Sequence, residues 1–317
     1  MKLFFTLLLS LIAAYAISCL FTIFINPEVT FWNDAVSRRL DDIASIRDKE
    51  PGKSIIFFTG GSSCAFSIDP QIVEKIIGRP VMNMGLPVAA GAHFIIHQAL
   101  RQARSGDTIV YTTAADILTY PDQNFSPSKI SFALEARRGL PTESVGGSTF
   151  GQSPTISQYL TLPRPGTEYL IVLAGRTATG KGYRYKLPDI RYHGLIQTPV
   201  RDKSMKPDGP RTVTTLSPEG RKLLETFAAA AKQKGVHVVY SIPLTYTATE
   251  QLGPSRAKNR EFLAEVAKII PVIDDGYSGA IDNIDNFADG KRHLSGQGSK
   301  IRSEAISKAL LSQLSEH

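Results

Sequence analysis

Residues 54–63 read SIIFFTGGSS, an apolar run that ends in two glycines and two serines. Isoleucine and phenylalanine dominate the run, and Gly60 and Gly61 end it abruptly. A buried strand of a parallel sheet has this appearance just before its turn into a helix. The stretch therefore predicts a central strand at 54–59, with Ser62 on a tight turn at its carboxyl end.

The alternation of strand and helix continues along the chain and predicts an α/β fold. Further strands are expected at 80–85, 107–111, 236–242 and 271–274, and helices at 70–77, 90–104, 128–138, 218–234, 254–269 and 295–314. This order predicts a mostly parallel five-stranded sheet with helices on both faces. Functional sites of such sheets lie at the carboxyl ends of the strands. The turns at 60–64, 85–91, 112–120 and 243–247 are therefore expected to share one edge.

The N-terminal residues 3–25, LFFTLLLSLIAAYAISCLFTIFI, carry no charge. At about 1.5 Å per residue a helix of this length crosses the hydrocarbon layer of a bilayer. A cleaved signal peptide has a shorter apolar region, about 7–15 residues, and ends in a small-x-small site. A lipoprotein signal ending at Cys19 is disfavoured by the apolar LFTIFI that follows. We expect residues 1–26 to be an uncleaved anchor in the inner (cytoplasmic) membrane. Lys2 on the short flank favours a periplasmic domain.

Three further parts follow the anchor. Residues 27–53 are expected to be a polar, partly helical stalk, and 54–317 to be the α/β domain. Between 139 and 215 the pattern blurs into Gly, Pro, Thr and Arg without a repeat. Because a structureless loop of this length is unusual in a compact domain, we expect an insertion with some helix near 167–175, which forms a lid or partner surface.

Charge is concentrated in this insertion. The net charge is +7, and residues 161–215 hold ten Lys and Arg against four Asp and Glu. A basic face suits an acidic polymer or anionic lipid head groups, and a solvated loop surface is the simpler alternative. The basic residues lack interleaved aromatics, so no nucleic-acid partner is expected. The two cysteines, Cys19 and Cys64, exclude a disulfide scaffold and a thiolate zinc cluster.

The turn at 60–63 fits no common phosphate or dinucleotide motif, and Cys64 occupies the last position of a G-x-S-x-G nucleophile elbow. A serine nucleophile needs a base and a group that orients the base. Asp289 and His293 follow the fifth predicted strand and can reach the same edge. Asn83-Met84-Gly85, at the end of the second strand, offers an amide for an oxyanion. The alternative is that Ser62 caps one helix and the Asp289–His293 turn caps another.

These blocks together resemble those of the SGNH (GDSL) hydrolases. Gly60-Gly61-Ser62 resembles the first block, Asn83-x-Gly85 the second, and Asp289-x-x-x-His293 the last, with a spacer one residue longer than the usual D-x-x-H. The resemblance implies a flavodoxin-like three-layer α/β/α fold. It also implies Ser62 as nucleophile, His293 as base, Asp289 as the orienting group, and the Gly85 amide as an oxyanion donor.

One block departs from the family. An asparagine normally follows the third strand, whereas residues 112–116 read TTAAD. Asn83 and the off-pattern Asn124 are the side chains left to donate to an oxyanion. The departure leaves open an incomplete oxyanion site or its completion by another residue.

The anchored arrangement resembles the accessory proteins of bacterial polysaccharide O-acylation. This resemblance implies that Ser62 carries an acyl group, with acetyl as the first candidate. It also implies a polysaccharide substrate and a multispanning membrane acyltransferase as partner. A solitary membrane-bound esterase and a non-catalytic scaffold are the alternatives. No cofactor is implied. No metal is expected either, because His93 and His97 lack a third ligand and Asp282, Asp285 and Asp289 lack the EF-hand spacing.

Overall fold

A computed structural model of the chain describes residues 2–120, 128–138, 174 and 183–314. Its centre is a sheet of four parallel strands in the order β2-β1-β3-β4. The strands are β1 (Ile56–Gly60), β2 (Val81–Asn83), β3 (Thr108–Thr112) and β4 (His237–Tyr240). β2 and β4 lie inside runs predicted to be strands, and β1 and β3 each end one residue beyond theirs. β1 is central because β2 and β3 pair with its two sides. The prediction of a mixed α/β fold with a parallel sheet is confirmed.

The fifth predicted strand is not formed as a strand. The run at 271–274 contributes a single parallel bridge, between Val272 and Tyr240. Tyr240 donates its amide to Pro271 and accepts one from Ile273, both at 2.8 Å. Proline has no amide to extend the ladder, and a turn at Gly276, with φ of +82°, follows shortly. The sheet therefore has four strands, with this segment lying beside its β4 edge.

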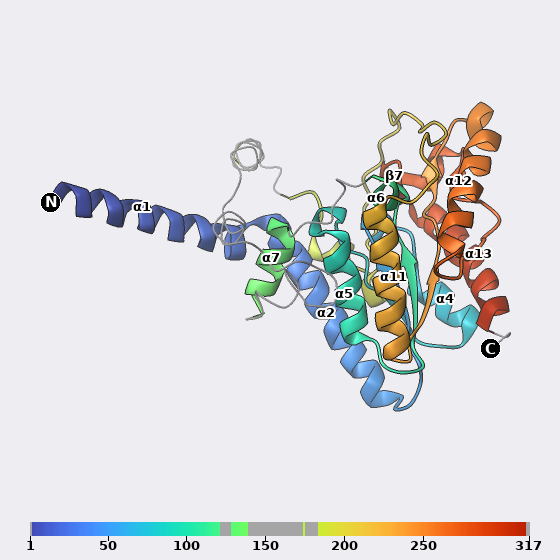
Figure 1. The fold of residues 1–317 in the computed structure, drawn as a ribbon, viewed down its shortest axis with the longest axis horizontal. Helices are drawn as coiled ribbons and strands as arrows, with labels where there is room; N and C mark the ends of the chain where they lie inside the picture. The colour runs from blue at the N-terminus through green and yellow to red at the C-terminus, as the bar shows by residue number, and fades with distance from the viewer. Residues whose placement is uncertain (1, 121–127, 139–173, 175–182, 315–317) are drawn as a thin grey trace.

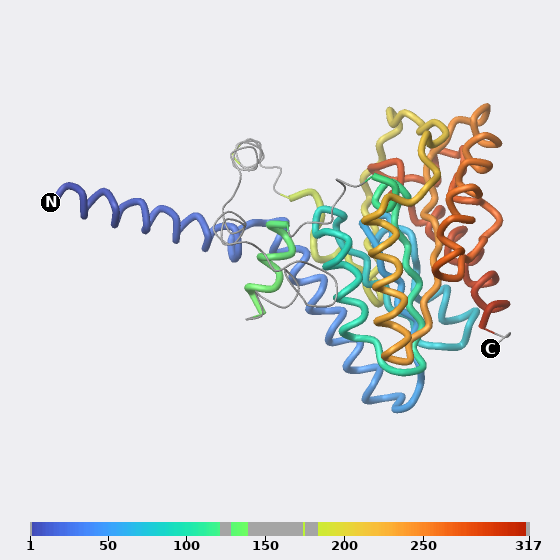
Figure 2. The backbone as a smooth tube through the Cα atoms, viewed as in Figure 1, coloured from blue at the N-terminus to red at the C-terminus, as the bar shows by residue number. Residues whose placement is uncertain are grey.

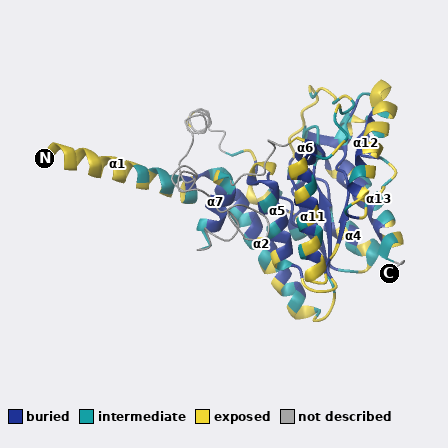
Figure 3. Ribbon diagram, in the orientation of Figure 1, coloured by how far each residue is buried: buried dark blue, intermediate teal, exposed yellow. Residues whose placement is uncertain are grey.

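Helices cover both faces of the sheet (Figure 1). Side chains alternate along the strands, so Phe57 and Ile109 pack in one cluster with the helices α5 and α11. Phe58 and Val110 point the other way and pack in a second cluster with α4 and α13. Figure 3 shows that the strands lie in the buried centre of the domain. The longer helices of the domain are α4 (Pro70–Ile77), α5 (Ala92–Gln102), α7 (Lys129–Ala136), α11 (Pro218–Gln233), α12 (Leu252–Ala267) and α13 (Gly296–Leu314).

These six helices confirm the sequence predictions to within a few residues. The start of α11 shows the cause, because Ser217 accepts a hydrogen bond from the amide of Gly220 and Pro218 occupies the first turn. The helix predicted near 167–175 lies outside the described residues except for Ala174. The remaining elements are short: α3 (Ser62–Ala65), α6 (Asp116–Thr119), β5 (Thr245–Tyr246), β6 (Ala280–Ile281), β7 (Phe287–Gly290), β8 (His293–Leu294), and the turns η2 (Val88–Ala90), η3 (Leu187–Asp189), η4 (Tyr192–Gly194), η5 (Thr249–Gln251) and η6 (Ile284–Asn286).

The N-terminal helix extends away from the domain, at the opposite end of the molecule from the C-terminus (Figure 2). It consists of α1 (Lys2–Leu20) and the π-helical turn η1 (Phe21–Ile25). Within the described residues it is the helix that is long and apolar enough to cross a membrane. None of the α1 side chains is buried. Lipid is the solvent that suits such a surface.

The segment expected as a stalk is mostly helix α2 (Pro27–Lys49), and this helix packs against the domain. Asn26 caps it by accepting hydrogen bonds from the amides of Glu28 and Val29. Its buried residues are Val29, Phe31, Trp32, Ala35, Val36, Arg39, Ile43 and Ile46. They recur at the three- and four-residue spacing of one helix face. The segment therefore contributes to the core of the domain.

Candidate active site

Ser62 lies at the carboxyl end of the central strand β1, as the first residue of helix α3. The two glycines before it have different roles. A side chain on Gly60 would come within 1.6 Å of the Thr112 carbonyl oxygen on β3, so this position admits only glycine. At Gly61 the nearest atom is Val88 Cβ, 3.5 Å away, which leaves room for a methyl group. Close packing of β1 against β3 thus requires glycine at position 60. The Ser62 side chain, just after this turn, is partly exposed.

His293 faces this serine from the other side of the site. Its Nε2 lies 2.9 Å from Ser62 Oγ, and its Nδ1 lies 2.8 Å from Asp289 Oδ1. The ring stacks on Phe66, with centroids 4.2 Å apart and planes within 9°. The three residues that the sequence proposed as a triad are therefore brought into one hydrogen-bonded line.

The unusual four-residue spacing between Asp289 and His293 has a local explanation. Strands β7 and β8 form an antiparallel hairpin in which Gly290 pairs with His293. Lys291 and Arg292 form the turn between them. The hairpin brings the carboxylate and the imidazole together although the spacer is one residue longer than in the usual D-x-x-H block.

Asp289 is held by two residues that the sequence did not single out. Its Oδ2 accepts hydrogen bonds from the Tyr185 hydroxyl at 2.8 Å and from Arg184 Nη1 at 2.6 Å. Burial acts to raise the pKa of Asp289, but the hydrogen bond and charge of His293, with those of Tyr185 and Arg184, lower this pKa to about 2. The group is a carboxylate at neutral pH and accepts a hydrogen bond from His293 Nδ1–H, which leaves Nε2 to accept a hydrogen bond from the Ser62 hydroxyl.

Tyr185 and Arg184 belong to the segment expected as an insertion. The Tyr185 ring packs between Phe66 and Phe31, at centroid distances of 5.0 and 5.9 Å. The aromatic Tyr183-Arg184-Tyr185 run was the signal available in the sequence, since alternating aromatics indicate a segment with one packed face. Part of the insertion therefore supports the candidate site.

The predicted oxyanion donors are placed differently from expectation. Asn83 is fully buried, and its Nδ2 donates to the carbonyls of Cys64 and Ile68 at 3.0 and 2.9 Å. Its Oδ1 accepts the Gly85 amide at 3.0 Å. A side chain on Gly85 would come within 2.3 Å of the Ala65 nitrogen. In this conformation the Asn83-x-Gly85 block braces helix α3, and both groups are engaged within the protein.

Two further points complete the oxyanion region. Asn124 lies outside the described residues. The Ser62 amide opens α3, where the first amides have no intrahelical acceptor, and its N-cap Gly61 brings no side chain to them. The Ser62 amide is therefore a candidate oxyanion donor.

Paired charges border the site at the turn that follows β3, the position at which SGNH hydrolases have their third block. Asp116 follows β3 and accepts a hydrogen bond from Arg292 Nη2 at 2.8 Å, and Arg211 Nη1 lies 3.6 Å from its other oxygen. Asp208 pairs with Lys291 and lies 3.6 Å from Arg292. Aspartate at position 116 therefore fixes the hairpin turn next to His293.

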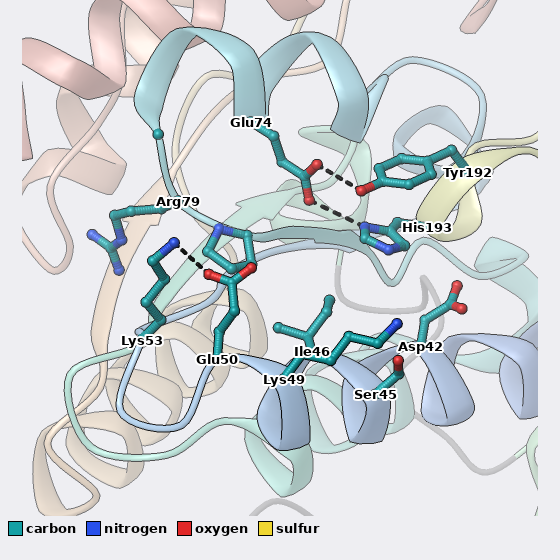
Figure 4. Close-up of a pocket in the computed structure, with 12 residues that line it drawn as sticks. Asp42, Ser45, Ile46, Lys49, Glu50, Lys53, Glu74, Arg79, Tyr192 and His193 are labelled. Atoms are coloured by element: carbon teal, nitrogen blue, oxygen red, sulfur yellow. Dashed lines mark hydrogen bonds and ion pairs between the residues drawn. The ribbon is translucent and has the colours of Figure 1, made fainter.

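A second histidine–carboxylate pair lines a separate hollow of about 500 Å³ (Figure 4). His193 Nδ1 lies 3.1 Å from Glu74 Oε1, and Tyr192 donates to Glu74 Oε2 at 2.9 Å. The hollow lies near the start of β2, because His193 also contacts the Val81 carbonyl. It is thus remote from the carboxyl edge that holds Ser62.

The sequence offered two groups of metal candidates, His93 with His97 and Asp282 with Asp285 and Asp289. Among the residues that the structure describes, no group of three or more His, Cys, Asp or Glu side chains is arranged to hold a metal ion. His93 is largely buried, and this burial, with the charge of Lys222, lowers its pKa to about 4. This environment favours the neutral imidazole at His93.

Comparison of the chain with protein-family models gave no match, and comparison with curated proteins gave none. The resemblance to SGNH hydrolases therefore rests on the three short sequence blocks alone.

Proposed function

We propose that the protein is a membrane-anchored SGNH-type acyl esterase or O-acyltransferase. Its substrate is an O-acyl group of an envelope polysaccharide or exopolysaccharide, and acetyl is the first candidate for this group. The observation that carries the proposal is the line Ser62–His293–Asp289, with both contacts within 2.9 Å. A base joined to a hydroxyl on one side and to a carboxylate on the other is the arrangement that activates serine.

The reaction follows from these contacts. Ser62 Oγ attacks the ester carbonyl carbon while its proton passes to His293 Nε2, and the carbonyl oxygen becomes an oxyanion beside the Ser62 amide. The ester C–O bond then breaks, and His293 returns the proton to the leaving hydroxyl. The acyl group remains on Ser62 until a sugar hydroxyl or water, deprotonated by His293, attacks it. The second oxyanion collapses, the bond between the acyl carbon and Ser62 Oγ breaks, and His293 returns the proton to Ser62 Oγ. The acceptor decides between transfer and hydrolysis.

The anchor supports the membrane part of the proposal. Arg137 of α7 donates to the Ile23 and Phe24 carbonyls, where η1 ends, and to Thr30 Oγ1. Helix α7 packs also against η2, whose Val88 lies beside Gly61. The end of the apolar helix is thus joined to the domain, with two elements, α7 and η2, between it and the nucleophile turn. An acyl donor delivered by a multispanning acyltransferase of the inner membrane would approach Ser62 from this side, with the domain in the periplasm.

A catalytically inactive scaffold or glycan-binding subunit is the second candidate. It is favoured by the engagement of the Gly85 amide with Asn83 Oδ1, which leaves fewer donors for an oxyanion. Removing one donor from an oxyanion hole costs about 100- to 1,000-fold in turnover. This candidate predicts that Ser62→Ala leaves polymer acylation unchanged in cells.

The test of the proposal is covalent capture of the nucleophile. The purified full-length chain in detergent is treated with an alkyl fluorophosphonate, and the adduct is located by peptide mass mapping. We expect stoichiometric labelling at Ser62, none in Ser62→Ala, and strongly slowed labelling in His293→Ala. Labelling spread over other serines, or equal rates for wild type and His293→Ala, would contradict the proposal.

A further inference from the structure

Arg39, on helix α2, is a buried guanidinium that takes part in none of the ion pairs of the described residues. Its exposure is 1%. Arg302 is equally buried but pairs with the buried Asp275. Burial lowers the pKa of Arg39 to about 10, so it keeps its charge at neutral pH. An unpaired buried cation is costly, which indicates a role that a neutral side chain does not fill.

The guanidinium joins two loops. Nη1 donates to the Gly85 carbonyl at 2.7 Å, and Nη2 donates to the Gly194 carbonyl at 2.9 Å. Gly194 has a φ of +96°, and a side chain there would come within 2.3 Å of the Asn83 carbonyl oxygen and 2.5 Å of Arg39 Nε. The backbone is thus shaped to admit the arginine.

Both loops support the helix that carries the nucleophile. Asn83 donates to the carbonyls of Cys64 and Ile68, as described above. From the other loop, the Ile196 amide donates to the Ala65 carbonyl at 2.8 Å. Arg39 therefore bridges the two loops that hydrogen-bond to the carbonyls at the end of α3 and just after it.

A second route leads from the same arginine to the turn before Ser62. The Gly85 carbonyl that Arg39 binds belongs to the peptide whose amide, on Leu86, donates to the Gly60 carbonyl at 3.0 Å. That carbonyl shares its peptide with the Gly61 amide. Hydrogen-bonded peptides polarise one another, so the positive charge of Arg39 is directed toward the turn where an oxyanion would form.

We propose that Arg39 is a positioning residue that holds Ser62 in line with His293. The inference rests on the proposed function of this site and deepens it. Because Arg39 lies on α2, which follows the apolar helix directly, the docking of the membrane-proximal helix sets the geometry of the nucleophile.

The test compares Arg39→Met, Arg39→Lys and the matched control Arg38→Met in the full chain in detergent micelles. Arg38 is the exposed neighbour on the same helix, with one long contact of 3.4 Å to the Leu187 carbonyl. Turnover of a chromogenic acetyl ester gives kcat and KM, the circular dichroism melt gives stability, and mass-detected hydrogen exchange follows the amides of 83–90 and 190–197.

We expect Arg39→Met to lower kcat by about 10- to 100-fold, since small misplacement of reacting groups has effects of this size, with KM within about twofold of wild type. Lysine keeps the charge without the two-pronged fork, so Arg39→Lys falls between. Exchange at 83–90 and 190–197 quickens in Arg39→Met, and Arg38→Met matches wild type. If the methionine variant does not fold, the lysine variant carries the comparison. Wild-type kcat in the Arg39 variants, or losses equal to the unfolded fraction, would overturn the inference.

Failure of the proposed function gives a different result. In that case the wild type turns over no ester, yet exchange still reports the bridge in the wild type and the Arg39 variants. Faster exchange at both loops in Arg39→Met or Arg39→Lys then supports the positioning role, and unchanged exchange refutes it.

Discussion

Two histidine–carboxylate pairs occupy different ends of the same sheet. His293 and Asp289 lie at the carboxyl edge with 2.8 Å between Nδ1 and Oδ1, and His193 and Glu74 lie near the start of β2 with 3.1 Å between Nδ1 and Oε1. Both histidines are partly buried, and both stack on an aromatic ring, Phe66 or Tyr192. By geometry the two pairs are broadly alike, although the Asp289 side chain is more deeply buried than that of Glu74.

Their difference lies in what the remaining polar atoms do. Nε2 of His293 reaches the partly exposed hydroxyl of Ser62. At the other pair, Nδ1 is shared between Glu74 and the Val81 carbonyl, and the Tyr192 hydroxyl is used on Glu74. Glu74 also accepts the Val81 amide at 2.9 Å. At the second pair, hydrogen bonds from His193 and Tyr192 to Glu74 hold their loop against the edge of the sheet, and we call this pair the clasp. At the first pair, Nε2 of His293 faces the hydroxyl of Ser62, so a base lies next to a nucleophile. The partner of Nε2 therefore distinguishes the candidate site from the clasp.

The largest expected effect separates a serine at each pair. Ser62→Ala removes the atom that carries the acyl group, so ester turnover is expected to fall by about 10⁴-fold or more, to background. Ser45 lines the hollow beside His193, and Ser45→Ala is expected to turn over within about twofold of wild type. Steady-state rates with a chromogenic acetyl ester check both. Substantial turnover by Ser62→Ala would remove the distinction.

The carboxylates give the next largest contrast. Asp289→Asn removes the negative charge and offers an amide N–H that donates to His293 Nδ1 and so favours the wrong tautomer, and turnover is expected to fall by about 10²- to 10⁴-fold. Glu74→Gln is expected to leave turnover intact while it weakens the clasp, at about 1–2 kcal/mol of unfolding free energy. Urea titration of each variant, beside the ester rates, measures this. A large rate loss in Glu74→Gln would show that the clasp also serves the reaction.

Tyr185→Phe sharpens the comparison, because it removes one hydrogen bond from Asp289 and keeps the ring packed on Phe66. Turnover is expected to fall by about 3- to 10-fold, since Arg184 and His293 still hold the carboxylate. Tyr192→Phe is the matched change at the other pair and is expected to leave turnover unchanged. The ratio of the two kcat values is the measurement, and a ratio near one would count against a positioning role of Tyr185.

The last expected effect is a pH dependence of stability. The pKa of Asp289 in the folded protein is about 2, below its ordinary value near 4. A depressed folded pKa stabilises above the ordinary pKa, and this contribution is lost as pH falls from about 4 to about 2. It amounts to about 2 kcal/mol. Urea midpoints across this window are expected to fall less steeply in Asp289→Asn than in wild type, and parallel slopes would contradict the assignment.

The carboxyl-edge rule explains why the sequence was informative about the candidate triad. Once 54–59 was identified as a strand, Ser62 had to lie at its carboxyl end, and the Asp289–His293 turn had to return to the same edge. The two glycines of the first block were also informative, although one of them is required by packing on Thr112 and the other is not.

Other features depended on the tertiary path and were missed. Arg184 and Tyr185 reach Asp289 from 105 and 104 residues away through a segment without clear periodicity. Asn83 carried a motif position, but only the structure shows that its amide is consumed by the carbonyls of Cys64 and Ile68. Asn26-Pro27 is a helix-start signal, and the apolar residues that follow it have helical spacing, so the packing of α2 was foreseeable. The polar composition of the segment led instead to the prediction of a stalk. The predicted fifth strand at 271–274 did not form because this short run begins at a proline.

The measurement that tests the central claim most directly replaces each histidine by glutamine. His293→Gln and His193→Gln are prepared as full-length proteins, their folding is verified by circular dichroism, and kcat for the chromogenic ester is compared with wild type. The account predicts a loss of about 10³-fold or more in His293→Gln and less than about threefold in His193→Gln. Equal turnover in the two folded variants would contradict it. The contact between His293 and Ser62 would then have no part in the reaction, and the Asp289–His293 segment would be only a polar turn.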